Sequence, residues 1–156
     1  MTIDDATLPD DCSCIVLAGG RSQRMGRPKA ALPIGGTSML ECIVARVAPL
    51  VREVVVIAAA EQEVPVMAAR VLRDRVRGEG PLPALALGLG TVTTPWAFAL
   101  GCDTPFIRRA VLRLLAHEVA GARGVIPLWN ERLQPLVALY HRTLVTSIDA
   151  LATRGE

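Results

Sequence analysis

A segment rich in glycine and cations, residues 19–29, holds the residue types best suited to binding phosphate groups. Gly19 and Gly20 lack side chains, so the backbone N–H groups beside them can approach phosphate oxygens closely. Arginines and Lys29, the only lysine of the chain, add countercharge, and an ammonium group binds a phosphate oxygen as a compact point charge. The spacing fits neither G-x-x-x-x-G-K-[ST] nor G-x-G-x-x-G, because the next glycine after the pair is Gly26. The segment predicts a polyphosphate-binding loop, and the alternative is a solvated turn with incidental arginines.

Two aspartates each follow a short apolar run, a position that indicates metal-assisted phosphate chemistry. Asp103 follows residues 96–102 and precedes a Thr-Pro turn. Mg²⁺ binds one or two protein carboxylates and takes further ligands from the phosphates of a substrate, so Asp103 is a candidate Mg²⁺ ligand. The alternative is that Asp103 caps the turn or the next helix. The arginines that flank Asp74 could simply pair with it, and Gly80 and Pro81 then form a tight loop before a helix whose N-terminus could face a ligand.

The elements that must position these residues follow from the apolar pattern. Short apolar runs predict strands at 14–18, 53–58, 70–73, 96–102, 124–127 and 134–139, and helical periodicity predicts helices at 38–47, 63–69, 82–89, 109–120 and 141–152. This alternation predicts an α/β fold, a Rossmann-like three-layer sandwich with a mostly parallel sheet. In such a sheet, ligands bind at the carboxyl ends of the strands, where the glycine-rich loop and Asp103 should meet.

Composition narrows the class of partner. The chain has 156 residues, 51% of them apolar but only 3% aromatic, and a net charge of +2. Its length fits one domain, which we expect over 14–156 after a flexible tail, 1–13. The low charge and few aromatic rings argue against nucleic acid, and the absence of a long apolar run argues against a membrane. The four cysteines should be reduced, without a structural metal, in a cytoplasmic protein.

The segment Leu17–Lys29, LAGGRSQRMGRPK, resembles the signature LAGGxSxRMGxxK of the molybdenum cofactor guanylyltransferases. Three further blocks fit that family in the right order: 80–82 (GPL), 102–106 (CDTPF) and 134–140 (QPLVALY). The resemblance covers nearly the whole chain from Cys14 onward. It implies a fold similar to the nucleotide-diphospho-sugar transferases and transfer of GMP from GTP to molybdenum-bound molybdopterin, with Mg²⁺ and release of pyrophosphate.

The resemblance also implies roles for particular residues. The catalytic group would be Arg21, Lys29 and Asp103, with Asp103 holding both Mg²⁺ and GTP. The residues implied in nucleotide binding lie in four parts of the chain: Leu17, Ala18, Gly19, Gly20, Ser22, Arg24, Met25, Gly26, Lys29, Asp74, Gly80, Pro81 and Asp103. Molybdopterin would meet Asn130, Arg132 and Gln134, for which an ordinary polar turn is the alternative. We expect Trp129 and Tyr140 to be packing residues.

Two departures from the family pattern bear on these roles. Family members carry an asparagine after the second strand that contacts the nucleotide, whereas this chain has Ala58-Ala59-Ala60-Glu61. That contact is therefore absent or made by the backbone. Family members also usually continue beyond the position of Glu156 with another helix and strand, so we expect this sequence to lack C-terminal elements of the family.

Three other functions compete with guanylyl transfer. A cytidylyltransferase for the same cofactor would be expected to read LAAG rather than LAGG, and a sugar-1-phosphate nucleotidylyltransferase would be expected to carry a Gly-Thr-Arg loop. A catalytically weak module that binds GTP and molybdopterin is the third possibility, suggested by the two departures. If the protein acts on or binds molybdopterin, a molybdoenzyme or a cofactor-handover protein would be a further partner.

Overall fold

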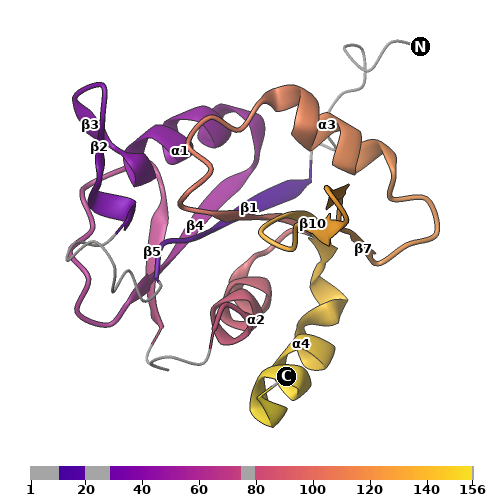
Figure 1. The fold of residues 1–156 in the computed structure, drawn as a ribbon. Coiled ribbons are helices and arrows are strands. Elements are labelled where there is room, and N and C mark those ends of the chain that lie inside the picture. The colour runs from indigo at the N-terminus through magenta and orange to yellow at the C-terminus, as the bar shows by residue number, and fades with distance from the viewer. Residues whose placement is uncertain (1–10, 20–28, 75–79, 156) are drawn as a thin grey trace.

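The computed structural model describes residues 11–19, 29–74 and 80–155. A six-stranded sheet with the order β5-β4-β1-β6-β10-β7 forms its centre (Figure 1). Its strands are β1 (Cys12–Leu17), β4 (Glu53–Ala59), β5 (Arg70–Asp74), β6 (Trp96–Gly101), β7 (Gly124–Val125) and β10 (Val137–His141). Strands β1, β4, β5 and β6 run parallel, and β10 runs antiparallel to both of its neighbours. The prediction of an α/β fold with a mostly parallel sheet is confirmed.

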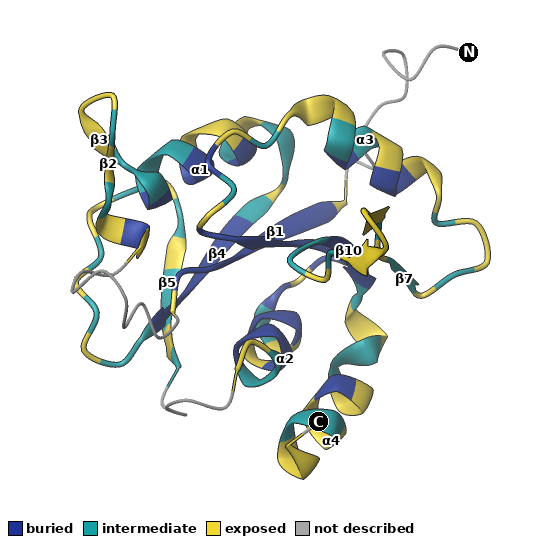
Figure 2. Ribbon diagram, viewed as in Figure 1, coloured by how far each residue is buried: buried dark blue, intermediate teal, exposed yellow. Residues whose placement is uncertain are grey.

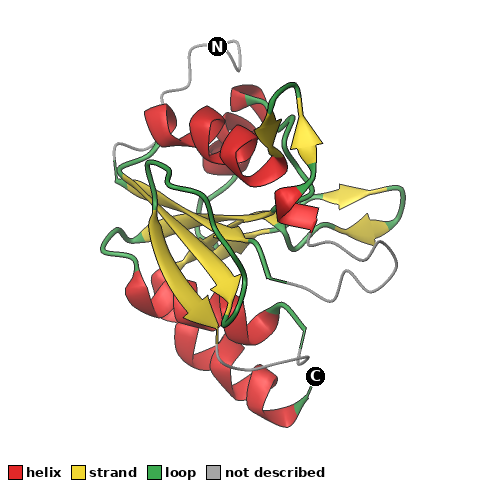
Figure 3. Cartoon of the chain, turned by 90° about the vertical axis from the view of Figure 1, so that its left-hand side faces the viewer, coloured by secondary structure: helices red, strands yellow, loops and turns green. Residues whose placement is uncertain are grey.

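Helices cover both faces of the sheet, which gives the predicted three layers (Figure 3). The helices α1 (Met39–Val47) and α3 (Arg109–His117) pack with Val16, Val56 and Phe98 on one face. The helices α2 (Leu82–Thr91) and α4 (Val145–Arg154) pack with Ile15 and Ile57 on the other. Successive strand residues point to opposite faces, so a strand that is covered on both faces has a continuous apolar sequence. Strand β1 is buried along its whole length (Figure 2).

Smaller elements complete the fold. Two hairpins, β2 (Pro33–Ile34) with β3 (Thr37–Ser38) and β8 (Leu128–Trp129) with β9 (Arg132–Leu133), lie outside the central sheet. Short 3₁₀ helices form η2 (Lys29–Ala31), η3 (Ala48–Leu50) and η4 (Arg142–Leu144). Helix α1 begins at a capping box in which Ser38 and Glu41 hydrogen-bond each other's backbone N–H groups, as its predicted start implies. No helix in the described ranges has the length and apolar character needed to cross a bilayer.

Several predicted boundaries are wrong, and one predicted helix is absent. Strand β1 already begins at Cys12, because Ser13 is fully buried and belongs to the ladder with β4. Residues 63–69 form no helix. Pro65 disfavours the helical conformation of the residue before it and has no backbone N–H to donate. Residues 134–136 form a turn before β10, with the Val137 N–H donating to the Gln134 carbonyl.

The parallel strands end together, and we call the place where Leu17, Ala59, Asp74 and Gly101 lie the carboxyl edge of the sheet. From β1 the chain adds β4 and then β5 on one side, and then crosses to place β6 on the other side of β1. The strand order therefore reverses between β1 and β6, which is where open α/β sheets bind ligands.

The opposite edge is held by a polar network around Glu53. The Glu53 carboxylate accepts hydrogen bonds from the Thr93 N–H and hydroxyl, both 2.8 Å, and from the Ser13 hydroxyl at 3.1 Å. Arg70 lies 3.2 Å from its other oxygen. Burial alone would raise the pKa of Glu53, but the bonds from Thr93 and Ser13 and the charge of Arg70 together lower it below its usual 4.5. The network therefore stabilises the fold through the ionised carboxylate.

The expected result for Glu53→Gln is a loss of about 1–2 kcal/mol of folding free energy at neutral pH, since hydrogen bonds and an ion pair to the carboxylate are weakened. Because the native pKa lies below the unfolded one, this stabilisation is fully present above the unfolded pKa and disappears as pH falls through the native pKa. Urea unfolding of both proteins between pH 7 and acid pH measures it. A difference that persists at the acid end would contradict this account.

Candidate functional site

The two groups that the sequence singles out for phosphate and metal chemistry meet at the carboxyl edge. Lys29 begins η2, and Asp103 follows β6 by two residues. The Lys29 Nζ lies 3.9 Å from the Asp103 Oδ2, and about half of each side chain is exposed. A cation and a carboxylate that face solvent side by side can bind a phosphate and a metal ion at adjacent points.

The Asp103 carboxylate is held in place by the backbone geometry of residues 101–104. The Thr104 N–H and hydroxyl both donate to the Gly101 carbonyl, at 3.1 and 2.7 Å, and close a tight turn after β6. The carboxylate folds back over Gly101, where an added Cβ would lie only 2.6 Å from the Asp103 Oδ1. Gly101 thus leaves the space that the carboxylate occupies, a close approach that only glycine permits.

The donor set suits Mg²⁺. Mg²⁺ needs only one or two protein carboxylates when phosphates and water supply its other ligands, and Asp103 presents a half-exposed carboxylate beside the Lys29 ammonium group. Among the described residues there is no cluster of three or more His, Cys, Asp or Glu side chains that could hold a metal by themselves. The site therefore fits an ion that arrives with its phosphate ligands.

The neighbouring Cys102 is not equipped to act as a nucleophile. Burial raises the pKa of the Cys102 thiol, and the charge of Asp103 raises it further against the opposing effect of Lys29. The other cysteines, Cys12, Cys14 and Cys42, are likewise free thiols, and burial raises the pKa of Cys12 to about 11. A protonated thiol attacks poorly, so neither Cys102 nor Cys12 is suited to nucleophilic attack.

The entry to the glycine-rich segment is fixed against β4. The Ala18 and Gly19 N–H groups both donate to the Ile57 carbonyl, at 2.9 and 3.2 Å, so neither is free to bind phosphate. An added Cβ on Gly19 would lie 3.3 Å from the Ala59 nitrogen, which shows how closely the two backbones approach. Leu17 and Ala18 are buried, and Gly19 is exposed. These three predicted nucleotide contacts therefore offer mainly carbonyl groups and a flat backbone surface.

Other predicted nucleotide residues lie on the side of β5. Asp74 ends β5, opposite Ala59 in the ladder with β4. Gly80 has a φ of 80°, and Pro81 is the N-cap of α2 without a side-chain cap for the helix N–H groups. The Leu85 N–H bonds the Pro81 carbonyl, and Pro83 has no N–H, so Leu82 and Ala84 carry the other backbone donors of the first turn. That this end of α2 faces a ligand stays a prediction. Six further predicted residues lie outside the described ranges: Gly20, Arg21, Ser22, Arg24, Met25 and Gly26.

The residues predicted to bind molybdopterin belong to the β8–β9 hairpin. Asn130 and Glu131 form its turn, with φ values of 47° and 60°, and Arg132 is exposed. The Gln134 amide donates to the Arg132 carbonyl at 3.2 Å. The hairpin leads into Leu136, whose carbonyl accepts from the Gly101 N–H at 2.9 Å, and so extends from the same edge as Asp103.

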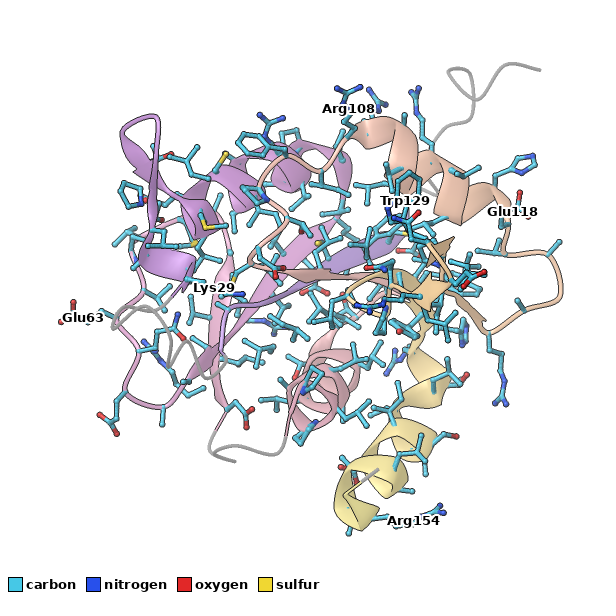
Figure 4. All side chains as sticks on the ribbon, viewed as in Figure 1. Lys29, Glu63, Arg108, Glu118, Trp129 and Arg154 are labelled. Carbon is cyan, nitrogen blue, oxygen red and sulfur yellow. The ribbon has the colours of Figure 1, made fainter. Side chains whose placement is uncertain are left out.

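The two aromatic residues of this region behave differently. Tyr140 is buried and donates its hydroxyl to the Pro135 carbonyl at 3.0 Å, which confirms it as a packing residue. The same expectation is wrong for Trp129, which is 71% exposed. Trp129 pairs with Arg132 across the hairpin, so both side chains point to the same face. Trp129 and Lys29 lie in different parts of the molecule (Figure 4).

One residue of the site, Gln62, is missed by the sequence patterns. Its side-chain oxygen accepts from the Ala59 N–H at 3.2 Å, and its side-chain nitrogen donates to the Ala18 carbonyl at 3.2 Å. Gln62 thus joins the ends of β1 and β4. The only sequence signal is an amide three residues after a strand. The helix wrongly predicted at 63–69 would have placed the Gln62 side chain toward solvent.

Comparison with known proteins identifies the family. The MobA-like NTP transferase domain matches residues 14–156. The chain belongs to the MobA-like NTP transferase family. Relatives include a "Probable molybdenum cofactor guanylyltransferase" of Mycobacterium avium, 38% identical over 148 residues, which cover 90% of this chain and 75% of the relative. A protein of the same name from Mycobacterium tuberculosis is 37% identical over 149 residues, 91% of this chain and 74% of the relative.

Solved structures of the same fold agree with this family. Molybdopterin-guanine dinucleotide biosynthesis protein A from Archaeoglobus fulgidus superposes with a TM-score of 0.74 at 22% identity, over 92% of this chain and 74% of the other. A 2-C-methyl-D-erythritol 4-phosphate cytidylyltransferase from Thermus thermophilus gives 0.70 at 21% identity, over 91% and 76%. At such identities the likeness concerns the fold, which the MobA-like family shares with nucleotidyltransferases for other substrates.

Proposed function

We propose that the protein transfers GMP from GTP to molybdopterin carrying molybdenum, releasing pyrophosphate. The observation that carries this proposal is the pairing of Lys29 with Asp103 at the carboxyl edge of a MobA-like fold. The names of the mycobacterial relatives support the choice of acceptor and nucleotide. The four free cysteines fit a reducing compartment, and we place the reaction in the cytoplasm.

In the proposed reaction, a terminal phosphate oxygen of molybdopterin forms a bond to the α-phosphorus of GTP. The bond from the α-phosphorus to the bridging oxygen breaks, and that oxygen leaves with the electron pair as part of pyrophosphate. Lys29 binds a phosphate oxygen and stabilises the negative charge that develops on the leaving group, and we assign Arg21 a similar role. Catalysis rests on orientation and charge, so it needs no covalent intermediate.

We further propose that Asp103 holds Mg²⁺, which when bound would neutralise charge on the phosphate oxygens. Asp74, the backbone of residues 17–19 and the N-terminus of α2 would contact GTP. The six residues outside the described ranges would complete the phosphate cradle. On the acceptor side we assign Asn130, Arg132 and Gln134 of the β8–β9 hairpin to molybdopterin, because they extend from the edge that carries Asp103.

A turnover assay tests the proposal directly. Purified protein with Mg²⁺, GTP and molybdenum-loaded molybdopterin is expected to release pyrophosphate, with CTP a much poorer donor. GTP should also raise the melting temperature more than CTP does, because only a ligand of the native state stabilises it. GTP binding without pyrophosphate release would leave a binding module, and an equal response to CTP would contradict the choice of guanine.

A further inference from the structure

Two side chains, those of Gln62 and Arg73, join the ends of the neighbouring strands β1, β4 and β5. The Gln62 amide bridges the Ala18 carbonyl, after β1, and the Ala59 N–H, at the end of β4. Arg73 of β5 donates to the Ala59 carbonyl at 3.2 Å and also to the Gln62 carbonyl. We call this set, Ala18, Ala59, Gln62 and Arg73, the strand-end clamp.

The clamp lies where the backbone must be held most precisely. Ala18 and Gly19 lead directly into the glycine-rich segment. A Cβ added to Gly19 would lie 3.3 Å from the Ala59 nitrogen, so the two backbones lie close together. The N–H groups of Ala18 and Gly19 bond the Ile57 carbonyl, and among the residues that the structure describes the Gln62 amide donates to the Ala18 carbonyl. Glu63, the next residue, points out into solvent (Figure 4). The inward turn of Gln62 is thus specific to its amide.

The amide is matched to both of its partners. A glutamine side chain offers one acceptor and one donor group, and here the acceptor meets an N–H and the donor meets a carbonyl. Each group retains one further hydrogen-bonding position at the partly exposed edge. Neither methionine, which has no donor, nor glutamate, which has no donor when ionised, can replace both bonds.

We propose that Gln62 is a positioning residue that sets the preference for guanine, by holding the Ala18 carbonyl and the end of β4 in the register that the base reads. This inference rests on the proposed function for the identity of the nucleotide. Guanine presents donors and an acceptor along one edge, so its recognition depends on the relative positions of fixed backbone groups. Cytosine presents one donor group beside two acceptors on the corresponding edge, so a fixed carbonyl such as that of Ala18 can accept fewer hydrogen bonds from it than from guanine.

Nucleotide binding by Gln62→Met and by the unaltered protein tests this role. We expect Gln62→Met to lose about ten-fold in GTP affinity, the equivalent of one to two hydrogen bonds, while CTP affinity changes little. In turnover, KM for GTP should rise by a similar factor and kcat should stay within about two-fold of the original. Glu53→Gln is the control, because it loses comparable hydrogen bonds at the opposite edge and should leave the GTP-to-CTP ratio unchanged.

The variant Gln62→Glu separates the donor from the acceptor. At about pH 8 the ionised carboxylate cannot donate to Ala18, so GTP affinity should be as low as in Gln62→Met. As pH falls toward about 4, most of the carboxyl becomes protonated and supplies an O–H donor, and the affinity relative to the unaltered protein measured at the same pH should recover. If Gln62 only stabilised the fold, protonation would raise the melting temperature of Gln62→Glu but would leave its ratio of GTP to CTP affinity unchanged.

The outcomes separate this inference from the proposed function. If the unaltered protein prefers GTP and Gln62→Met keeps that preference, or loses GTP and CTP binding equally, the role of Gln62 is overturned. If the unaltered protein does not bind GTP or release pyrophosphate, the proposed function fails instead. Should Gln62→Met unfold, Gln62→Glu across the same pH range still gives the answer within one protein.

Discussion

Asp103→Asn is expected to lower kcat/KM for guanylyl transfer by about a hundred- to a thousand-fold. Asparagine keeps the shape of the side chain but removes the charge that would hold Mg²⁺ against the phosphates, and single electrostatic contacts of this kind contribute about 10²–10³ in rate. Stability should hardly change, because an exposed ion pair such as Lys29–Asp103 contributes roughly 0–1 kcal/mol. Steady-state kinetics and urea unfolding measure the two effects.

In the absence of metal, we expect Asp103→Asn to have no adverse effect on GTP affinity, in contrast to its effect on turnover. Asp103 repels the phosphates and partly neutralises Lys29, 3.9 Å away, so Asp103→Asn should bind GTP at least as tightly as the unaltered protein in the presence of a chelator. Adding Mg²⁺ should then strengthen binding only in the unaltered protein. Asp149→Asn, an exposed position on α4, is the matched control. Mg²⁺-dependent activity that survives in Asp103→Asn would contradict the assignment of the metal ligand.

The meeting of Lys29 and Asp103 could be predicted from the sequence, because it depends on features that local patterns encode well. Two buried apolar runs, each followed by a polar turn, place both residues at one edge of any parallel sheet. The exact strand limits were not needed for this. The prediction for β1 is wrong by two residues at its start and by one at its carboxyl end, which leaves that end at the same edge of the sheet.

Gln62 and Trp129 could not be placed in the same way, because their positions depend on backbone that has no periodic pattern. Gln62 turns inward since residues 60–62 form a turn after β4 and Pro65 prevents a helix beyond it. Trp129 is exposed because a two-residue turn, Asn130-Glu131, carries the hairpin away from the core. Sequence patterns report burial along long regular elements, whereas Gln62 lies in a turn and Trp129 in a strand of only two residues.

Gly101→Ala is expected to reduce activity by about ten- to a hundred-fold without unfolding the protein. The added methyl group would lie 2.6 Å from the Asp103 Oδ1, and the next nearest atom outside Asp103, the Leu136 Cβ, is at an ordinary 3.7 Å. The carboxylate is the end of a short rotatable side chain and is half exposed, so it can swing away at little cost in folding free energy. A displacement of about 1 Å in a catalytic group can cost about 10² in rate.

The melting temperature of Gly101→Ala distinguishes a change at the site from a loss of folded protein. Gly101 has no left-handed φ that would strain an alanine, and alanine in place of glycine reduces the entropy of the unfolded chain, a gain of about 0.4–1 kcal/mol where the native backbone accepts it. The melting temperature should therefore stay level or rise while kcat falls. Gly90→Ala, whose added methyl meets only the Val145 Cγ2 at 3.6 Å, should share the gain in stability and keep full activity. If Gly101→Ala kept the original kcat, the position of the Asp103 carboxylate over Gly101 would have no part in catalysis, and the metal site would have to be sought elsewhere on the carboxyl edge.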